Sequence, residues 1–188
     1  RLPRIFRQAQ SSRIVMNAHA INRGLYPNVS NGADSDFFFM PMEDPEQVAQ
    51  TIVSLVRDRL PKAYHLDRNK IQVLTPMQRG HVGAANLNML LQEALNSSKT
   101  ALSRGGYSFR QGDRVMQIRN NYDKEVFNGD LGYVQEIDTD DRTLLADFDG
   151  KLVEYEYSEL DELTLAYATT IHKSQGSEYP IVVMPVLM

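Results

Sequence analysis

Two runs of polar residues follow short apolar segments, and both contain groups that can bind phosphate. The first run is Thr75-Pro76-Met77-Gln78-Arg79-Gly80, and the second is Thr169-Thr170-Ile171-His172-Lys173-Ser174-Gln175-Gly176-Ser177-Glu178. A Thr hydroxyl and exposed backbone N–H groups at a strand end can grip a phosphate, and His and Lys add donors and charge. Glycine permits a tight turn or the close approach of a ligand. On the residues alone, a phosphate site and an ordinary polar loop are about equally supported.

Several other kinds of site are excluded or weak. The chain has no Cys, which excludes disulfides, a thiolate zinc site and a cysteine nucleophile, and its four His residues are scattered, so no metal site is predicted. No G-x-x-x-x-G-K-[ST] loop occurs, and the only Gly-Lys pair, Gly150-Lys151, reads as a hairpin turn. Asp161-Glu162 could suggest magnesium, but no apolar strand precedes it.

The elements that must position these runs alternate between helices and short apolar strands. Helices are expected from Ser12 to about Arg23, from Asp44-Pro45 to about Leu60, and after Gly83 along Leu87 to Leu95. Short buried strands are expected at residues 37–40, 71–75 and 181–184. This alternation predicts an α/β layer with a mostly parallel sheet, in which loops at the strand ends bind ligands.

The pattern changes after about Asp113. Residues 114–119, 129–137, 143–148 and 151–157 read as short strands, and Asp149-Gly150 is a hairpin turn signal. Residues 121–162 contain 14 acids and 3 bases, whereas the remaining residues contain 17 bases and 10 acids. We therefore predict a small acidic β-barrel at 121–162, inserted in an α/β domain formed by 1–120 and 163–188. The basic remainder is compatible with binding a phosphate backbone, although charge alone favours the simpler explanation of solvated surface charge.

Length and composition set the broad class. The longest apolar run, residues 181–188, has eight residues and contains Pro185, which is too short for a membrane span. No leader with a charged and then an apolar segment opens the chain, so a cytoplasmic protein without a membrane partner is expected. Because the chain starts without Met and stops at an apolar segment, we expect it to be a piece of a longer protein.

Four stretches resemble a known family. Ala168–Glu178 resembles motif V of superfamily 1B DNA helicases, in the RecD/TraA group, the exodeoxyribonuclease V alpha-chain family. Ile5–Ala9, with Ser12 and Ile14, resembles motif IV. Val73–Gly80, with Gly83, Leu87-Asn88 and Leu91-Gln92, resembles the family block that comes after motif IV. Gly112–Gln117 through Phe127–Gly132 resembles the segment that enters the family's inserted barrel. The resemblance implies a RecA-like (P-loop NTPase-like) motor domain, 2A, that carries an SH3-like barrel, 2B.

The resemblance also implies residue roles. Arg7 resembles the motif IV arginine that acts in catalysis and reaches the γ-phosphate of ATP, and Gln175, Gly176 and Glu178 resemble nucleotide-facing positions of motif V. The positions that resemble contacts to single-stranded DNA are Thr75, Arg79, Thr170, His172 and Lys173. The cofactor implied is ATP with Mg²⁺. The Mg²⁺ ligands and both Walker motifs are expected in an N-terminal motor domain before Arg1, and motif VI after Met188, so the chain alone is expected to be inactive.

The function that the resemblance implies is that of the C-terminal part of an ATP-dependent 5′–3′ DNA helicase in recombination and repair. Its expected partners are single-stranded DNA, the missing N-terminal motor domain and subunits of a nuclease–helicase complex. Two alternatives stay open. One is a non-catalytic module whose acidic barrel docks a basic protein partner, and the other is a relaxase-linked conjugative helicase.

Overall fold

The computed structural model describes residues 12–186, which divide into two compact units at Glu43 and Asp44. In the first unit, helix α1 (Arg13–Asn22) begins at Ser12, whose hydroxyl accepts a hydrogen bond from the Val15 N–H. The Asp36 carboxylate accepts hydrogen bonds from the Ser12 hydroxyl, at 2.5 Å, and from the Arg13 N–H, at 2.7 Å. The helix expected from Ser12 is thereby confirmed, and its first turn is tied to the loop that follows it.

The strand expected at residues 37–40 does not form. The backbone of Phe39 bonds in both directions to the side chain of Asn31 instead of to a neighbouring strand. Phe38, Phe39 and Met40 are each more than 40% exposed. Apolar residue types alone predicted a strand there, but a strand also needs a partner for its backbone groups.

The second unit begins with helix α2 (Pro45–Ser54), which continues through a π-helical turn, η1 (Leu55–Arg59), into α3 (Leu60–Tyr64). Asp44 caps the start by accepting a hydrogen bond from the Glu46 N–H, and Pro45 occupies the first turn, as the sequence predicts. The π turn lies before Pro61, which has no N–H to donate to the preceding turn. The helix ends at His65, which has a left-handed φ of 51°.

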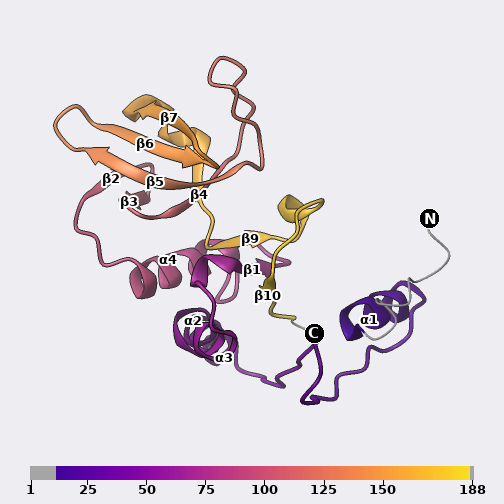
Figure 1. Ribbon diagram of the computed structural model, residues 1–188. Coiled ribbons are helices and arrows are strands. Elements are labelled where there is room, and N and C mark those ends of the chain that lie inside the picture. The colour runs from indigo at the N-terminus through magenta and orange to yellow at the C-terminus, as the bar shows by residue number, and fades with distance from the viewer. Residues whose placement is uncertain (1–11, 187–188) are drawn as a thin grey trace. The chain divides into compact units, whose positions relative to one another are not determined.

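A three-stranded parallel sheet forms the centre of this unit (Figure 1). Its strands are β1 (Ile71–Thr75), β9 (Ala168–Thr170) and β10 (Ile181–Val183), in the order β10-β1-β9. Helix α4 (Ala84–Leu95) follows β1, and α2 and α4 bury one core with it that includes Ile52, Val73 and Leu87. The predicted α/β class with a parallel sheet is confirmed, although the sequence patterns did not reveal β9 as a separate strand.

A second sheet is antiparallel and takes three of its five strands from the acidic part of the chain (Figure 1). Its order is β7-β6-β5-β4-β8, with β4 (Arg114–Gln117), β5 (Leu131–Asp138), β6 (Thr143–Phe148), β7 (Lys151–Glu156) and β8 (Leu163–Leu165). A short 3₁₀ segment, η3 (Tyr157–Glu162), joins β7 to β8. The hairpin of β2 (Ala101–Arg104) and β3 (Tyr107–Arg110) adds Leu102 and Phe109 to the same core. We call these elements the barrel region; β4 and β8 lie outside 121–162, and the domain boundaries remain predictions.

Residue pairs that could mimic functional motifs have structural roles here. Asp149 and Gly150 have φ of 55° and 89° and form the β6–β7 turn, so Gly150-Lys151 is a hairpin, as predicted. Asp161 pairs with Arg119 at 3.3 Å, and Glu162 accepts a hydrogen bond from Gln117 at 2.8 Å. Within residues 12–186, no group of three His, Asp or Glu side chains could hold a metal ion. In the same range, every helix is too short or too polar to cross a membrane.

Candidate nucleotide and DNA interface

The two polar runs meet at one edge of the parallel sheet. β1 and β9 are paired in parallel, and Thr75 lies directly opposite Thr170 at their carboxyl ends. The Ile171 N–H donates to the Thr75 carbonyl at 3.0 Å, which continues the pairing one step beyond the strands. Segments far apart in the sequence therefore emerge side by side. We call this edge, with the loops 76–83 and 171–178, the strand-end edge.

Thr75 is buried and supports the first loop from inside. Its side chain is fully buried, and its hydroxyl donates to the Val82 carbonyl at 2.7 Å and accepts from the Met77 N–H at 3.4 Å. Both hydrogen bonds of this hydroxyl are thus made within the loop that follows Thr75. A contact between Thr75 and DNA remains a prediction, and its role in this structure is to fix the turn.

The first loop is fastened to the start of α4. The N–H groups of Ala84 and Ala85 donate to the carbonyls of Met77 and Gln78, at 3.0 and 3.2 Å. A Cβ on Gly83 would lie 2.4 Å from the carbonyl carbon and oxygen of Arg79, so glycine is needed there for close packing. The backbone at Arg79 is therefore held firmly while its side chain is exposed.

The second loop presents exposed polar side chains after β9. The hydroxyls of Thr169 and Ser174 lie 2.7 Å apart in a buried contact that closes the turn. The Lys173 N–H donates to the Thr170 hydroxyl at 3.4 Å within the short 3₁₀ helix η4 (His172–Ser174). His172 and Lys173 are exposed. Three exposed side chains with donor groups, Arg79, His172 and Lys173, thus lie in the two loops of this edge.

The candidate nucleotide-binding residues come directly after η4 in the chain. Gln175, Gly176 and Glu178 are exposed, and the Ser177 N–H donates to the Ser174 carbonyl at 3.1 Å. Gly176 has φ of 84°, and a Cβ added to it would meet no atom within 4 Å, so backbone conformation rather than space favours glycine there. Arg7 lies outside the described residues. The structure therefore brings Gln175, Gly176 and Glu178 into one exposed loop, and the proposed common face with Arg7 stays a prediction.

Sequence reasoning missed how the barrel region is joined to the parallel sheet. The residues between β8 and β9 are clamped by Asn88 of α4, whose side-chain amide donates to the carbonyls of Leu165 and Ala168 and accepts from the Ala168 N–H. Asn88 is 6% exposed. A polar residue on the apolar face of a predicted helix is the signal that could have revealed this clamp, because a buried amide needs partners.

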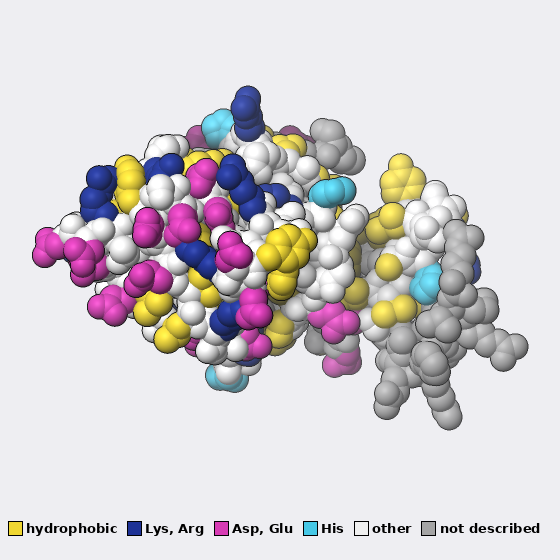
Figure 2. Space-filling model, turned by 90° about the horizontal axis from the view of Figure 1, so that it is seen from above, with side chains coloured by type: hydrophobic (Ala, Val, Ile, Leu, Met, Phe, Trp, Pro, Cys, Tyr) yellow, Lys and Arg dark blue, Asp and Glu magenta, His cyan; other side chains and the backbone are white. Residues whose placement is uncertain are grey.

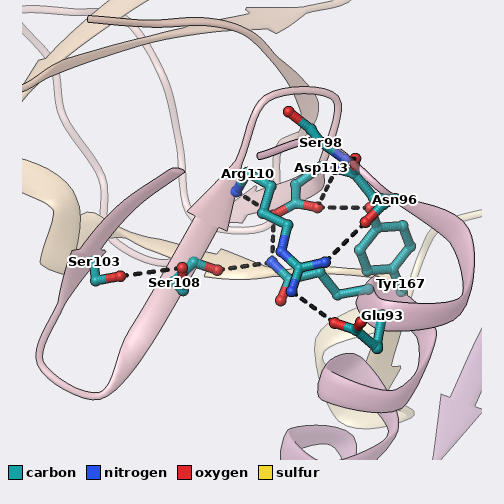
Figure 3. A network of polar contacts seen from close by, with 9 residues as sticks. Glu93, Asn96, Ser98, Ser103, Ser108, Arg110, Asp113 and Tyr167 are labelled. Atoms are coloured by element: carbon teal, nitrogen blue, oxygen red, sulfur yellow. Dashed lines mark hydrogen bonds and ion pairs between the residues drawn. The ribbon is translucent and has the colours of Figure 1, made fainter. Parts of the chain in front are cut away.

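A second joint centres on the Asp113 carboxylate, which is fully buried (Figure 3). It accepts hydrogen bonds from the side chains of Gln92, Asn96 and Tyr167 and from the Arg110 N–H, at 2.6 to 2.8 Å. Burial, and then the charge of Asp113, raise the pKa of the Tyr167 hydroxyl above its ordinary value, which keeps it a donor. The network connects the end of α4 and the β3–β4 turn to Tyr167, the residue directly before β9.

Comparison with known proteins supports this reading. The model for the SH3 domain of ATP-dependent RecD-like DNA helicases matches residues 87–148, and the model for the UvrD-like helicase C-terminal domain matches residues 165–188. The chain is 35% identical over 179 residues to the ATP-dependent RecD2 DNA helicase of Deinococcus radiodurans, covering 95% of this chain and 23% of that protein. It is 28% identical over 127 residues to the RecBCD enzyme subunit RecD of Haemophilus influenzae, covering 65% and 18%.

Among solved structures, a Bacteroides Pif1 helicase in complex with ADP-AlF3 and ssDNA matches 80% of this chain and 45% of its own, with 19% identity and a TM-score of 0.48. Pif1 helicase from Candida albicans matches 84% and 51%, with 15% identity and a TM-score of 0.44. The chain spans about a quarter or less of the length of the curated relatives named above. It is a relative of the RecD-like DNA helicases and corresponds to a C-terminal region of that family, which confirms the resemblance inferred from residues 168–178.

Proposed function

We propose that this chain is the C-terminal motor part of an ATP-dependent DNA helicase that moves 5′ to 3′ and acts in recombination and repair. In this proposal the strand-end edge forms part of the track for single-stranded DNA and supplies one side of the ATP cleft. The observation that carries the proposal is the register of β1 and β9, which brings the loops after Thr75 and Thr170 together. The relationship to RecD2 supports it, because that relative is an ATP-dependent DNA helicase.

The DNA contacts proposed here are charged and independent of sequence. Arg79 and Lys173 would bind phosphates and His172 would donate a hydrogen bond, on a backbone that Thr75, Gly83 and Ser174 hold in place. Such contacts suit a motor that must bind any sequence and release it again.

The residues present fit one side of a nucleotide. The exposed Gln175 amide, the Gly176 backbone and the Glu178 carboxylate could bind its polar groups, and Arg7 would stabilise charge on the transferred phosphoryl group. ATP with Mg²⁺ would supply the energy for movement.

Binding of a fluorescent single-stranded oligonucleotide to the 188-residue chain tests the DNA track. We expect Arg79→Ala and Lys173→Ala each to weaken binding for all sequences and to reduce the salt dependence of log K by about 1. Arg119→Ala removes an exposed charge of the barrel region and serves as the matched control. An equal loss of DNA affinity in all three variants would mean that overall charge drives binding, and it would refute the assignment of the DNA track to the strand-end edge.

ATP turnover tests the nucleotide assignment. In the full-length protein, we expect Arg7→Ala to lower DNA-stimulated ATP hydrolysis while DNA binding stays close to that of the parent. The 188-residue chain alone is expected to hydrolyse no ATP, because half of the cleft is supplied from elsewhere. Unchanged turnover in the variant would remove Arg7 from the site, and hydrolysis by the purified chain would contradict the divided cleft.

The acidic barrel region supports a second candidate function, the docking of a basic protein such as a nuclease–helicase subunit. In the space-filling view, Asp and Glu side chains gather on the left, with Lys and Arg side chains among them (Figure 2). The exposed acids of the barrel region include Glu136, Asp138, Asp140, Asp141, Asp149, Glu154 and Glu156. In the full-length protein, loss of a partner on deletion of 121–162, with strand binding retained, would support docking; retention of the partner would argue against it.

A further inference from the structure

A cavity of about 260 Å³ lies at the opposite end of β1 from the strand-end edge. Asn69 and Ile71, at the start of β1, line one side of it, and Leu95 and Asn96, at the end of α4, line another. Gly112 and Arg114 contribute from the segment that enters the barrel region. The cavity is therefore separate from the loops to which the nucleotide and DNA roles are assigned.

Arg114 is a buried cation in the wall of this cavity. It is 8% exposed, and among the described residues its Nη1 donates only to the carbonyls of Asn69 and Ile71, at the long distances of 3.2 and 3.5 Å. Its Nε is buried without a hydrogen-bond partner, and within residues 12–186 no carboxylate forms an ion pair with it. A buried guanidinium normally has a charged or fully hydrogen-bonded partner.

Two carboxylates near the cavity already have hydrogen-bond or ion-pair partners. Asp113, the neighbour of Arg114 in sequence, accepts four hydrogen bonds from other groups (Figure 3). Asp58, which follows Val56 of the cavity wall by two residues, pairs with Arg57 at 2.7 Å. A second guanidinium, that of the exposed Arg68, also lines the cavity. Among the residues that the structure describes, the lining thus includes two arginines and no acidic side chain.

We propose that this cavity binds a phosphate-class oxyanion between Arg114 and Arg68. An anion with several oxygens can accept hydrogen bonds from two guanidinium groups on different elements, and a phosphate can carry two negative charges to match them. Arg114 lies on β4 of the barrel region, and Arg68 lies in the short 3₁₀ segment directly before β1 of the parallel sheet. The bound anion would therefore link β4 to the start of β1. The phosphate comes either from solution or from a nucleic-acid backbone.

Titration of the 188-residue chain with inorganic phosphate, at constant ionic strength against chloride, tests the site. We expect saturable NMR shifts of the amides of Asn69, Ile71 and Gly112. Arg114→Gln is expected to weaken phosphate binding at least about tenfold and Arg68→Gln by a smaller factor. Arg68 is exposed, so its variant keeps the test valid if Arg114→Gln fails to fold. Arg59→Gln, an exposed arginine outside the cavity, is the matched control.

Each outcome decides the proposal. Shifts at those three amides, weakened in Arg68→Gln and kept in Arg59→Gln, support it. Three results would overturn it: no shifts at these amides, an equal loss of phosphate affinity in Arg68→Gln and Arg59→Gln, or tighter binding of acetate than of phosphate. A short oligonucleotide that displaces phosphate identifies nucleic acid as the source, and failure to displace identifies a free anion. Because the strand-end edge is elsewhere, loss of single-stranded DNA binding in Arg79→Ala leaves this result unaffected.

Discussion

The barrel region and the strand-end edge use polar side chains in opposite ways. In the barrel region, charged groups pair with each other: Lys124 with Glu159 at 2.5 Å, Lys151 with Glu125 at 2.8 Å, and Arg119 with Asp161 at 3.3 Å. At the strand-end edge, buried hydroxyls fix the loops, while Arg79, His172, Lys173 and Glu178 are exposed and form no ion pair among the described residues. Three cations of the barrel region are thus held in ion pairs within that region, whereas the strand-end edge leaves its cations available to a ligand.

The two regions also differ in how their strands are supported. The barrel strands reach eight residues and enclose a core that includes Phe109, Leu144 and Tyr155, each at most 1% exposed. The parallel sheet has strands of three to five residues, and its edge residue Val182 is 46% exposed. A packed scaffold beside short strands with polar loops is a common arrangement for binding sites, since loops carry function and cores carry stability.

The largest expected effect comes from emptying the barrel core. Phe109→Ala should lower the free energy of unfolding by about 3–5 kcal/mol, because it leaves a cavity where a buried ring was packed. Tyr107→Ala, on the same strand but 49% exposed, should cost less than about 0.5 kcal/mol. Chemical denaturation measures both values. Similar losses of unfolding free energy in the two variants would mean that the core of the barrel region is not tightly packed around Phe109.

An intermediate effect is expected from Gly83→Ala at the other region. The added Cβ would overlap the backbone of Arg79, so we expect about 1–3 kcal/mol of destabilisation and weaker single-stranded DNA binding as the loop shifts. Gly32→Ala, whose Cβ would meet only the end of the Arg13 side chain at 3.7 Å, is the control for thermal stability and binding. Full DNA affinity in Gly83→Ala would show that the position of Arg79 does not matter.

The smallest effect concerns acid stability. Burial alone would raise the pKa of Glu159, but hydrogen bonds from Lys124 and from the Glu156 N–H hold it below the ordinary 4.5. A lowered pKa in the folded state adds stability above about pH 4.5, and this stability is lost as pH falls through the folded value. Glu159→Gln should therefore cost at most about 1 kcal/mol near neutral pH and nothing in strong acid.

Thermal unfolding across that pH range measures the difference between Glu159→Gln and the parent chain. Glu136→Gln, an exposed acid on β5 without an ion pair among the described residues, is the control and should run parallel to the parent. A constant difference between Glu159→Gln and the parent at every pH would show that the Lys124 pair does not shift this carboxyl group.

Several elements could be read from local patterns because their signals are local. Asp44-Pro45 starts a helix in any context that permits one, and Asp149-Gly150 adopts the positive φ values that its hairpin requires. β1 and β6 formed at the predicted bounds, since their apolar runs end at clear breaks. By contrast, β9 has three residues, two of them Thr, and is defined by its pairing with β1 rather than by its composition.

The sequence by itself determined the alternation of helices and strands, the acidic barrel pattern and the polar runs after residues 74 and 168, because propensity, capping and spacing act within a few residues. Only the tertiary structure decided that Thr75 turns inward, that Thr170 lies opposite it, and that Asp113 and Asn88 join the barrel region to α4 and to the start of β9. It also left Phe37–Met40 outside any sheet and placed Arg114 and Arg68 in the wall of one cavity. These outcomes depend on partners distant in the chain, and a buried polar group gains its stability only when such partners are in place.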